Sequence, residues 1–481
     1  MKKNLIRRKT VSIILACMVS VGVLSGCNNE RPDTSSSESL DNNISSQTTT
    51  DQSASTGGDE VLDGIIIQDG LAWNTNTNQY VIEDAVLSGS VPLKLWLDNE
   101  EYGLFVKERF EAMYPGVVIE FQMVGSVDSA DMMALAGESG SGADVYLIPH
   151  DHIGNTHNRN LIGPMGLYED EIRERFNETG VGIVNIDGQL WGVPYLTESI
   201  ALFYNQTLLQ QLADDGLIES ATPAADFNDI LALSEVYDNP AQNKYSIRWE
   251  PGNAYMSHFF LTAFGYELFG PDGADPNSPG FDSQDVVDGL EYFASMRQAW
   301  NVLANDANWE STTIEFAKGE TPYMIMGPWG IEDVQKGADE HGFQFSVMPL
   351  PKVDGKQPYT FSGSQLIVVS PYSPYPAASR VLAMFIGSDE ILEYTYSVMG
   401  KVPALKSQYA DNISGLKDDE RIQAIMAQAA FSKPMPAIKE ISYFWDPAGA
   451  MYQSVWDRTA TPADAAAKAY SDYMALLQAA Q

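Results

Sequence analysis

The chain has 481 residues, too many for one ordinary hydrophobic core, so we expect two or more lobes. Its formal net charge of -37 argues against nucleic acid as a partner, because phosphate contacts require clustered Lys and Arg. The only cysteines are Cys17 and Cys27. Disulfides, thiolate metal sites and a cysteine nucleophile are therefore excluded from everything after Cys27.

The first thirty residues have the pattern of an export signal. A basic start is followed by an apolar stretch from Val11 to Leu24, too short to span a bilayer comfortably and followed by no stop-transfer pattern. Leu24-Ser25-Gly26-Cys27 resembles the lipobox of bacterial lipoproteins, in which the cysteine is diacylated and becomes the new N-terminus. We therefore expect removal of residues 1–26 and a lipid anchor on Cys27, at the extracytoplasmic face of the cell membrane. The alternative is an ordinary signal peptide with a chance cysteine.

Residues 27–60 consist mainly of Ser, Thr, Asp, Asn and Gln. Such a segment cannot bury enough apolar surface to offset the entropy of ordering, which predicts a disordered tether. Residues 61–90 contain short apolar runs, at 65–67 and 80–82, and are expected to form an ordered N-terminal extension. The sequence assigns this extension no role.

Strands and helices alternate from residue 93 onward. Residues 93–97 predict a buried strand, and the next apolar residues recur at helical spacing up to Pro115-Gly116: Tyr102, Phe105, Val106, Phe110 and Met113. A strand at 117–124, a short helix around 132–135 and a strand at 144–148 follow. This alternation predicts an α/β fold with a parallel-type sheet covered on both faces. His150-Asp151-His152 then falls beyond the carboxyl end of a strand, where ligands bind in such sheets.

The remainder of the chain continues this mixture. Residues 201–204 form an apolar strand that we expect Glu198 to introduce, and a helix begins near Ser283. A strand at 323–326 runs into Gly327-Pro328-Trp329. The C-terminus is predicted to be helical, with Thr461 as the cap and Pro462 at the first helical position.

Sugar recognition requires flat apolar faces that stack on pyranose rings, together with carboxylates, amides or His that bond hydroxyl groups. Trp329 and Trp445 both follow Gly- or Pro-rich breaks, a placement typical of aromatic side chains that project from loops. On pattern alone, a buried structural role for each Trp is an equal alternative.

Metal binding is not favoured. In an extended segment His150 and His152 would point to one side and Asp151 to the other, with no third ligand at a recognisable spacing. Asp272 and Asp275 lack the spacing of a calcium loop, and a solvated loop is the favoured interpretation there. We expect neither a metal nor a cofactor.

Two glutamates stand in partly apolar settings. Glu198 and Glu250 could be the acid/base pair of a glycosidase, or they could accept hydrogen bonds from sugar hydroxyls without catalysis. The sequence contains neither a nucleophile elbow nor a phosphate-cradling loop.

From about Leu93 to the C-terminus, a set of motifs resembles the maltose/maltodextrin-binding proteins of the extracellular solute-binding family of ABC importers. The segments that carry the resemblance are, in order, Gly142-Ala143-Asp144-Val145 with His150-Asp151, Trp191-Gly192-Val193-Pro194 with Glu198 and Leu202-Phe203-Tyr204-Asn205, Phe316-Ala317-Lys318-Gly319-Glu320-Thr321, Gly327-Pro328-Trp329, and Met435-Pro436 with Phe444-Trp445.

The resemblance implies a two-lobed Venus-flytrap fold with the ligand cleft between the lobes. We expect lobe 1 at 91–197 and 360–410, and lobe 2 at 198–359 and 411–481. By the same resemblance Trp329 and Trp445 stack on sugar rings, and Tyr255 is a gap-dependent match to another stacking aromatic. Hydroxyl groups are bonded by Asp151, Glu198 and Glu250, Met435 makes an apolar contact, and His150 and Glu100 lie at the ligand loops.

The sequence departs from the family pattern at two positions, so the resemblance specifies the class of sugar and not the individual sugar. Ile148 and Asp446 occupy positions where the family places aromatic side chains. The resemblance implies a monomer that captures an oligosaccharide such as a maltodextrin for the permease of an ABC importer, with no enzymatic activity. The alternatives are a surface-anchored glycoside hydrolase and a ligand-sensing adaptor of the same fold.

Overall fold

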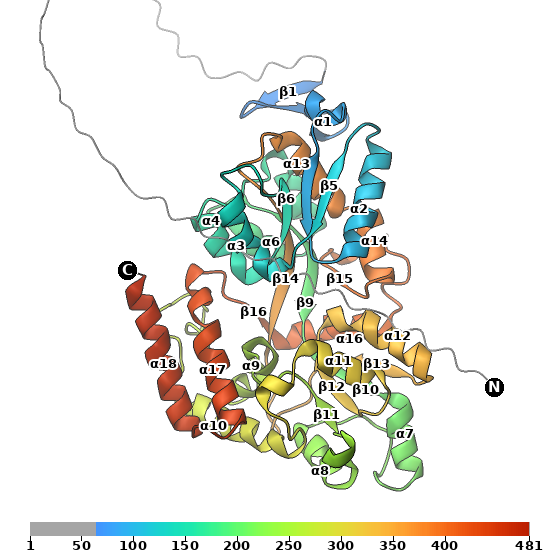
Figure 1. Cartoon of the computed structure of the whole chain (residues 1–481), viewed down its shortest axis with the longest axis vertical. Helices are drawn as coiled ribbons and strands as arrows, with labels where there is room; N and C mark the ends of the chain where they lie inside the picture. Colours follow the sequence, from blue (N-terminus) through green and yellow to red (C-terminus); the bar gives the residue numbers. More distant parts are fainter. Residues whose placement is uncertain (1–63, 481) are drawn as a thin grey trace, which may run out of the picture. The chain divides into compact units, whose positions relative to one another are not determined.

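The computed structural model describes residues 64–480 (Figure 1). The export signal expected at 1–26, Cys27 and the tether expected at 27–60 lie outside the described residues. The described residues belong to one compact unit.

Lobe 1 is built on a seven-stranded sheet. Its path runs β15-β9-β14-β6-β4-β5, and β16 pairs with the far end of β14. The strands are β4 (Leu93–Leu97), β5 (Ile119–Met123), β6 (Val145–Pro149), β9 (Val193–Ser199), β14 (Thr360–Val369), β15 (Val402–Pro403) and β16 (Ser432–Pro434). The strands predicted at 93–97, 117–124 and 144–148 are confirmed, to within two residues at each end.

The expectation of a parallel sheet is only partly correct. β5, β4 and β6 are parallel, but β14 is antiparallel to both β6 and β9. The reason lies in the path of the chain. β14 enters lobe 1 on the return from lobe 2, so it runs against the strands that the local strand–helix alternation had predicted.

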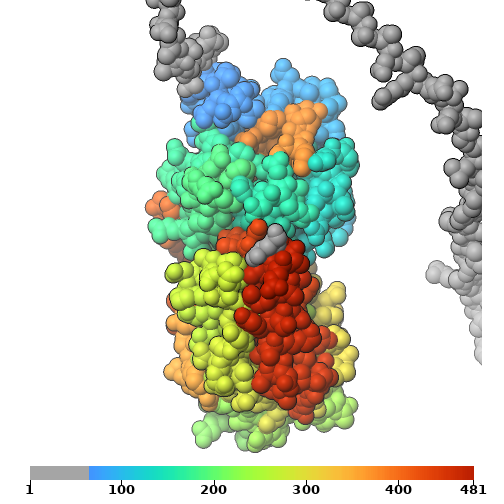
Figure 2. Space-filling view, turned by 90° about the vertical axis from the view of Figure 1, so that its left-hand side faces the viewer, coloured from blue at the N-terminus to red at the C-terminus, as the bar shows by residue number. Residues whose placement is uncertain are grey.

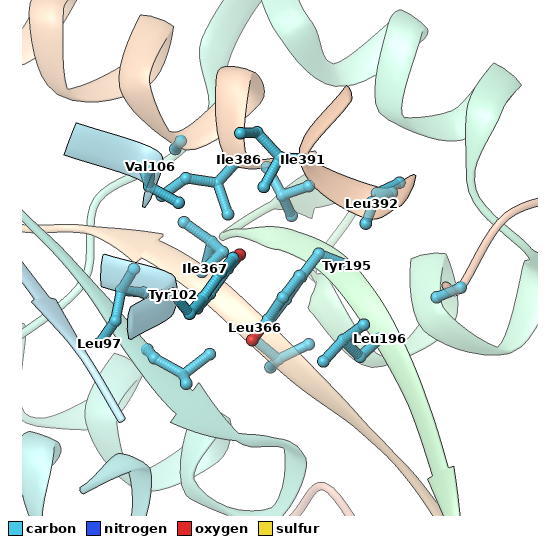
Figure 3. Close-up of a cluster of buried hydrophobic side chains, with 14 of the residues drawn as sticks. Leu97, Tyr102, Val106, Tyr195, Leu196, Leu366, Ile367, Ile386, Ile391 and Leu392 are labelled. Carbon is cyan, nitrogen blue, oxygen red and sulfur yellow. The ribbon is translucent and has the colours of Figure 1, made fainter. Parts of the chain in front are cut away.

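Helices cover both faces of this sheet. Every residue of β6 and of β14 is buried, as expected when both faces of a strand are covered. In Figure 3, Tyr102 and Tyr195 lie amid aliphatic side chains from the sheet and from three of these helices. The helices of lobe 1 are α2 (Glu100–Met113), α3 (Ser126–Ala136), α4 (Ile153–Asn158), α5 (Glu169–Arg175), α6 (Glu178–Val184), α13 (Pro376–Ile386), α14 (Asp389–Ser397) and α15 (Ser407–Ala410), with a short hairpin of β7 (Asn185–Ile186) and β8 (Gln189–Leu190).

The helix predicted after residue 97 is α2, which begins where the Asn99 side chain accepts a hydrogen bond from the Tyr102 amide. Tyr102, Val106 and Phe110 are buried, as predicted from their spacing. Met113 was expected on the same buried face but is 53% exposed, because it is the last residue of the helix.

Lobe 2 contains a four-stranded sheet between two layers of helices. The strand order is β11-β12-β10-β13, with β11 (Ile247–Arg248), β12 (Tyr323–Met326), β10 (Ala201–Asn205) and β13 (Phe345–Met348). Alternate residues face opposite cores: Leu202 and Ile325 belong to one, and Phe203 and Met324 to the other. The helices are α7 (Gln206–Asp214), α8 (Phe227–Tyr237), α9 (Ala254–Thr262), α10 (Gln284–Ser295), α11 (Trp309–Ala317), α12 (Ile331–His341), α16 (Glu420–Gln428), α17 (Trp445–Trp456) and α18 (Pro462–Ala479).

The C-terminal helices complete lobe 2. The prediction that Thr461 caps the last helix is confirmed, since its hydroxyl accepts a hydrogen bond from the Asp464 amide. α17 and α18 pack on α10, and Figure 2 shows these red helices beside the yellow-green segment of the middle of the chain.

The chain passes between the lobes along the central strands. Only Ile200 separates the end of β9 from the start of β10, and Figure 1 shows β9 and β14 extending toward the smaller sheet. β16, from the segment expected in lobe 2, pairs in parallel with β14. The residue boundaries of the lobes stay a prediction.

The extension forms a three-stranded antiparallel sheet and one helical turn: β1 (Ile65–Gln68), β2 (Leu71–Asn74), β3 (Gln79–Tyr80) and α1 (Asp84–Leu87). It packs on lobe 1, where Trp73 and Tyr80 each contact Tyr168 edge-on. The Tyr80 hydroxyl accepts a hydrogen bond from the Leu167 amide. Both oxygens of Glu83 accept backbone amides at the start of α13, which joins the extension to that helix.

Candidate functional site

A cleft of about 560 Å³ lies between the two lobes. The end of β6, the end of β9 and the middle of β14 form one wall, and the other wall is formed by α9, α17 and the segment after β12. The lining side chains discussed below are Asp98, His150, Asp151, Glu198, Gln365 and Lys401 on lobe 1, and Glu250, Tyr255, Trp309, Trp329, Met435 and Trp445 on lobe 2 or the segment leading to it.

The lobe 1 wall supplies carboxylates because strands end there. Asp98 directly follows β4, and Asp151 lies in the turn η1 (His150–His152) that follows β6. Since β4 and β6 are parallel, their carboxyl ends meet at the same edge of the sheet. Glu198 is the second-last residue of β9, so it reaches this edge from a strand that runs the opposite way to β14.

Two expectations about this wall need correction. His150-Asp151-His152 is a 3₁₀ turn and not an extended segment, so its side chains do not alternate in direction. Glu198 does not introduce the apolar strand β10, because it belongs to β9 and the chain changes lobe at Ile200.

The lobe 2 wall supplies aromatic rings. Trp329 follows β12 in the turn η6 (Pro328–Gly330), and Trp445 is the first residue of α17. Tyr255 is in the first turn of α9, where the Asn253 side chain accepts hydrogen bonds from the Tyr255 and Met256 amides. The Tyr255 and Trp329 rings are 6.2 Å apart between centroids and inclined at 50°. Both tryptophans are partly exposed, which agrees with the prediction that they project from chain breaks.

One hydrogen bond links the two walls. The Trp445 indole N–H donates to Oδ2 of Asp151 over 2.9 Å. This bond orients the Asp151 carboxylate and the Trp445 ring relative to each other. The other oxygen of Asp151 retains its capacity to accept a hydrogen bond from a ligand.

Burial controls the charge state of this site. Removal of water raises the pKa values of Asp151, Glu198 and Glu250 above the ordinary range for carboxyl groups. For Glu198 the positive charge of Lys401 and a hydrogen bond from Gln365 partly oppose this rise. His150 is completely buried, and burial lowers its pKa to about 4, so its imidazole is neutral at physiological pH.

The structure brings together eight of the nine residues predicted to bind a ligand. His150, Asp151, Glu198, Glu250, Tyr255, Trp329, Met435 and Trp445 all line the cleft. Glu100 does not. It is the exposed first residue of α2, and Asp98 lines the cleft two positions earlier.

The two positions that depart from the family pattern also lie outside the cleft lining. Ile148 is fully buried within β6, and Asp446 is exposed in the first turn of α17. Neither offers a face on which a sugar ring could stack.

Sequence reasoning missed several lining side chains. Trp309, 47% exposed at the first position of α11, follows a capping box formed by Asn308 and Ser311. An aromatic residue directly after a helix cap was the available signal. Lys401 and Gln365 had none, because only the pairing of β9 with β14 and β15 places them at the cleft.

Within residues 64–480, no group of three or more His, Cys, Asp or Glu side chains is arranged to hold a metal ion. At the loop considered for calcium, Asp275 instead accepts hydrogen bonds from the Asn277 amide and the Ser278 hydroxyl. No helix in the described part of the chain is both long and apolar enough to cross a membrane.

Residues 106–424 match the bacterial extracellular solute-binding proteins, which is about two thirds of the chain. The chain belongs to this family. Members of the family bind solutes outside the cytoplasm, in agreement with a cleft between two lobes.

Three relatives are similar over about the same length. They are the maltotriose-binding protein of Pyrococcus abyssi, with 25% identity over 74% of this chain and 76% of its own; the galactooligosaccharide-binding protein of Bacillus subtilis, with 24% identity over 69% and 76%; and a maltooligosaccharide ABC transporter solute-binding lipoprotein of Streptococcus pneumoniae, with 24% identity over 73% and 80%.

A solved structure of a cyclo/maltodextrin-binding protein complexed with maltotetraose has the same fold. It superimposes with a TM-score of 0.65 at 26% sequence identity, over 81% of this chain and 98% of that one. The expected two-lobed fold of periplasmic sugar-binding proteins is thereby confirmed.

Proposed function

We propose that this chain captures a neutral oligosaccharide in the cleft, with maltodextrins as the first candidates, and delivers it to the permease of an ABC importer. One observation carries the proposal: aromatic rings line lobe 2, and carboxylates line the facing wall of lobe 1. A pyranose ring has apolar faces and a polar rim of hydroxyl groups, so it is complementary to such a pair of walls.

The relatives support the ligand class more strongly than the individual sugar. Two of them are named for maltose-type ligands and one for galactooligosaccharides, at nearly equal identity. We place maltodextrins first because Trp329, Trp445, Asp151 and Glu198 match the pattern expected for maltodextrin-binding proteins.

We further propose that no bond of the sugar is broken. Binding of the sugar to both walls would favour the conformation in which the lobes are closed, and this conformation would be the signal to the permease. The affinity would come from stacking on lobe 2 and from hydroxyl hydrogen bonds on lobe 1.

The anchoring expected from the sequence is part of the same proposal. A monomer held at the outer face of the membrane by lipid on Cys27 would release sugar close to the permease. The relative from Streptococcus pneumoniae, which is named a lipoprotein, supports this arrangement. Mass spectrometry of the mature N-terminus, with Cys27→Ser as the comparison, tests it: diacylated Cys27 is expected in the wild type, and an unmodified Cys27 would exclude the anchor.

The binding proposal is tested by isothermal titration of residues 64–481 with maltotriose, maltotetraose, a galactotriose and cellotriose, followed by chromatography of each sugar. We expect saturable binding of one sugar series, with the sugar recovered intact. Recovery of shortened sugars would show that the chain is a glycoside hydrolase and not a binding protein. If none of the sugars binds, an oligosaccharide is the wrong ligand class.

A further inference from the structure

Lys401 is the only Lys or Arg among the described residues that line the cleft. It directly precedes β15, which pairs with β9 on the side away from β14. Its side chain is 11% exposed, and its ammonium nitrogen lies 3.6 Å from Oδ2 of Asp98. At that separation the two groups attract each other by charge, without a close hydrogen bond. The ammonium group therefore keeps donors available for a ligand.

Acceptors without partners lie on the same wall. Within the described part of the chain, Oδ1 of Asp98 and Oε1 of Gln365 are buried and accept no hydrogen bond. The Gln365 amide nitrogen donates to Glu198 over 2.9 Å, which fixes the direction of the amide. A buried acceptor without a partner destabilises the free protein, so such atoms in the lining of a binding cleft indicate contacts that a ligand completes.

The combination of a donor and acceptors restricts the ligand chemistry. A hydroxyl group can accept a hydrogen bond from Lys401 and donate its own proton to Asp98 or Gln365. An anionic ligand would gain Lys401 but would face the carboxylates of Asp98, Asp151 and Glu198. A neutral group rich in hydroxyls satisfies both kinds of partner.

We propose that Lys401, Asp98 and Gln365 form a hydroxyl-binding subsite on lobe 1 that holds one sugar unit of the ligand. The subsite rests on the proposed function, since it is part of the same cleft. It assigns a direct role in ligand binding to three residues that no motif had indicated. The positive charge of Lys401 also offsets the repulsion between Asp98 and Glu198, because it acts on both carboxyl groups.

The test combines variants with sugars that lack single hydroxyl groups. Isothermal titration compares wild type, Lys401→Gln and the control Lys336→Gln with the preferred trisaccharide and its monodeoxy derivatives. Lys336 is a suitable control because its side chain is 67% exposed and pairs with Glu332 on α12, away from the cleft lining. Asp98→Asn is a second variant, in case Lys401→Gln does not fold, and thermal unfolding of each free protein reports folding.

We expect Lys401→Gln to weaken binding of the parent sugar about tenfold, the loss of one charge-assisted hydrogen bond. For wild type, one deoxy sugar should bind about tenfold more weakly than the parent sugar. For Lys401→Gln, that deoxy sugar and the parent sugar should bind with equal affinity. Asp98→Asn should lose less affinity than wild type with the same deoxy sugar, because a neutral amide oxygen accepts a weaker hydrogen bond than a carboxylate. Lys336→Gln should resemble wild type.

If wild type binds sugars and Lys401→Gln retains the wild-type affinity, or shows the wild-type pattern of losses across the deoxy series, the subsite is excluded while the proposed function stands. The subsite is also excluded if only Asp98→Asn folds and it retains both the wild-type affinity and the wild-type pattern of losses across the deoxy series. If wild type binds none of the sugars, the proposed function and the subsite fall together.

Discussion

Glu198 is surrounded by groups from several elements. Asp98 follows β4, Asp151 lies in η1, Lys401 precedes β15, and Gln365 on β14 donates a hydrogen bond to it. The pKa of Glu198 is raised in spite of Lys401 and Gln365, so burial outweighs the attraction. The ionised form is therefore less stable in the folded protein than in the unfolded chain.

We expect Glu198→Gln to stabilise the free protein while it weakens sugar binding. In wild type, the Glu198 carboxyl keeps its proton to a higher pH in the folded state than in the unfolded chain. The free energy of unfolding therefore falls as the pH rises through the folded pKa of Glu198. Glutamine removes that loss at neutral pH but is a weaker acceptor, and we expect an affinity about tenfold or more below wild type. Thermal unfolding and titration calorimetry measure the two effects.

The gain in melting temperature should disappear below the ordinary Glu pKa of 4.5, where Glu198 is protonated in both states. A variant that is destabilised at pH 7 would show that the ionised carboxylate contributes net stability in the absence of sugar. An unchanged affinity would show that Glu198 does not contact the ligand.

Sugar affinity should fall on acidification, and the fall should begin at a pH above the ordinary carboxyl range. The reason is that Asp151, Glu198 and Glu250 all have raised pKa values, so protonation removes ionised acceptors earlier than in exposed groups. Titration calorimetry from pH 7.5 to 4, limited to the range in which thermal unfolding shows an intact fold, measures the profile. His150 does not contribute above its pKa of about 4. A flat profile down to pH 4 would contradict a role for these carboxylates as ionised acceptors.

The sequence predicted those site residues that carry an aromatic ring or a carboxylate next to a recognisable chain break, such as Trp329, Trp445 and Asp151. It could not predict Lys401 or Gln365, because each reaches the cleft through strand pairing between segments far apart in the chain. Glu100 was expected from the family resemblance alone, and it is the first residue of α2, outside the cleft lining.

At the scale of elements, α4 of lobe 1 and the segment after Met435 approach each other closely. A Cβ atom on Gly154 would overlap the carbonyl oxygen of Ala437 and lie 3.2 Å from the Lys439 amide. α4 follows β6 of the larger sheet, and the segment after Met435 leads into α17 of lobe 2, so this contact joins the two lobes.

We expect Gly154→Ala to weaken sugar binding about tenfold, because the added methyl group would displace the two lobes at this contact. Gly182→Ala is the matched control: Gly182 is also in a helix, α6, and an added Cβ meets no atom within 4 Å. Ala at that position should leave the affinity unchanged and could stabilise the helix by about 0.5–1 kcal/mol. Calorimetric titration compares the sugar affinities of the two variants. Equal affinities would show that the close contact at Gly154 is not needed for sugar binding.

The element pattern was predictable where local spacing specified it. The strands β4 and β12, the start of α10 and the cap of α18 were predicted from the sequence because hydrophobic periodicity and capping chemistry are local. The antiparallel direction of β14 depends on the return of the chain from lobe 2, and no local signal specifies it.

At the scale of the whole molecule, the extension of residues 64–90 completes lobe 1 and lies outside the predicted lobe boundaries. Trp73, Tyr80, Ile82 and Val86 are buried against the core of lobe 1. The Glu83 carboxylate accepts the amides of Ala377 and Ala378, which satisfies backbone donors at the N-terminus of α13. None of these residues lines the cleft.

A protein that begins at Val91 should therefore lose stability without losing its binding site. Each of the four buried side chains contributes about 1.5–3 kcal/mol, so the deletion should lower the free energy of unfolding by several kcal/mol.

Thermal unfolding of residues 64–481 and 91–481 measures this loss, and titration at a temperature where both are folded compares their affinities. The affinity per folded molecule should be unchanged, because no residue of the extension lines the cleft. Equal melting temperatures would show that the extension is not part of the stable fold, and a large loss of affinity in a folded deletion variant would show that it supports the cleft. Glu83→Gln, with the exposed Glu108→Gln on α2 as control, separates the contribution of the cap from that of the apolar contacts.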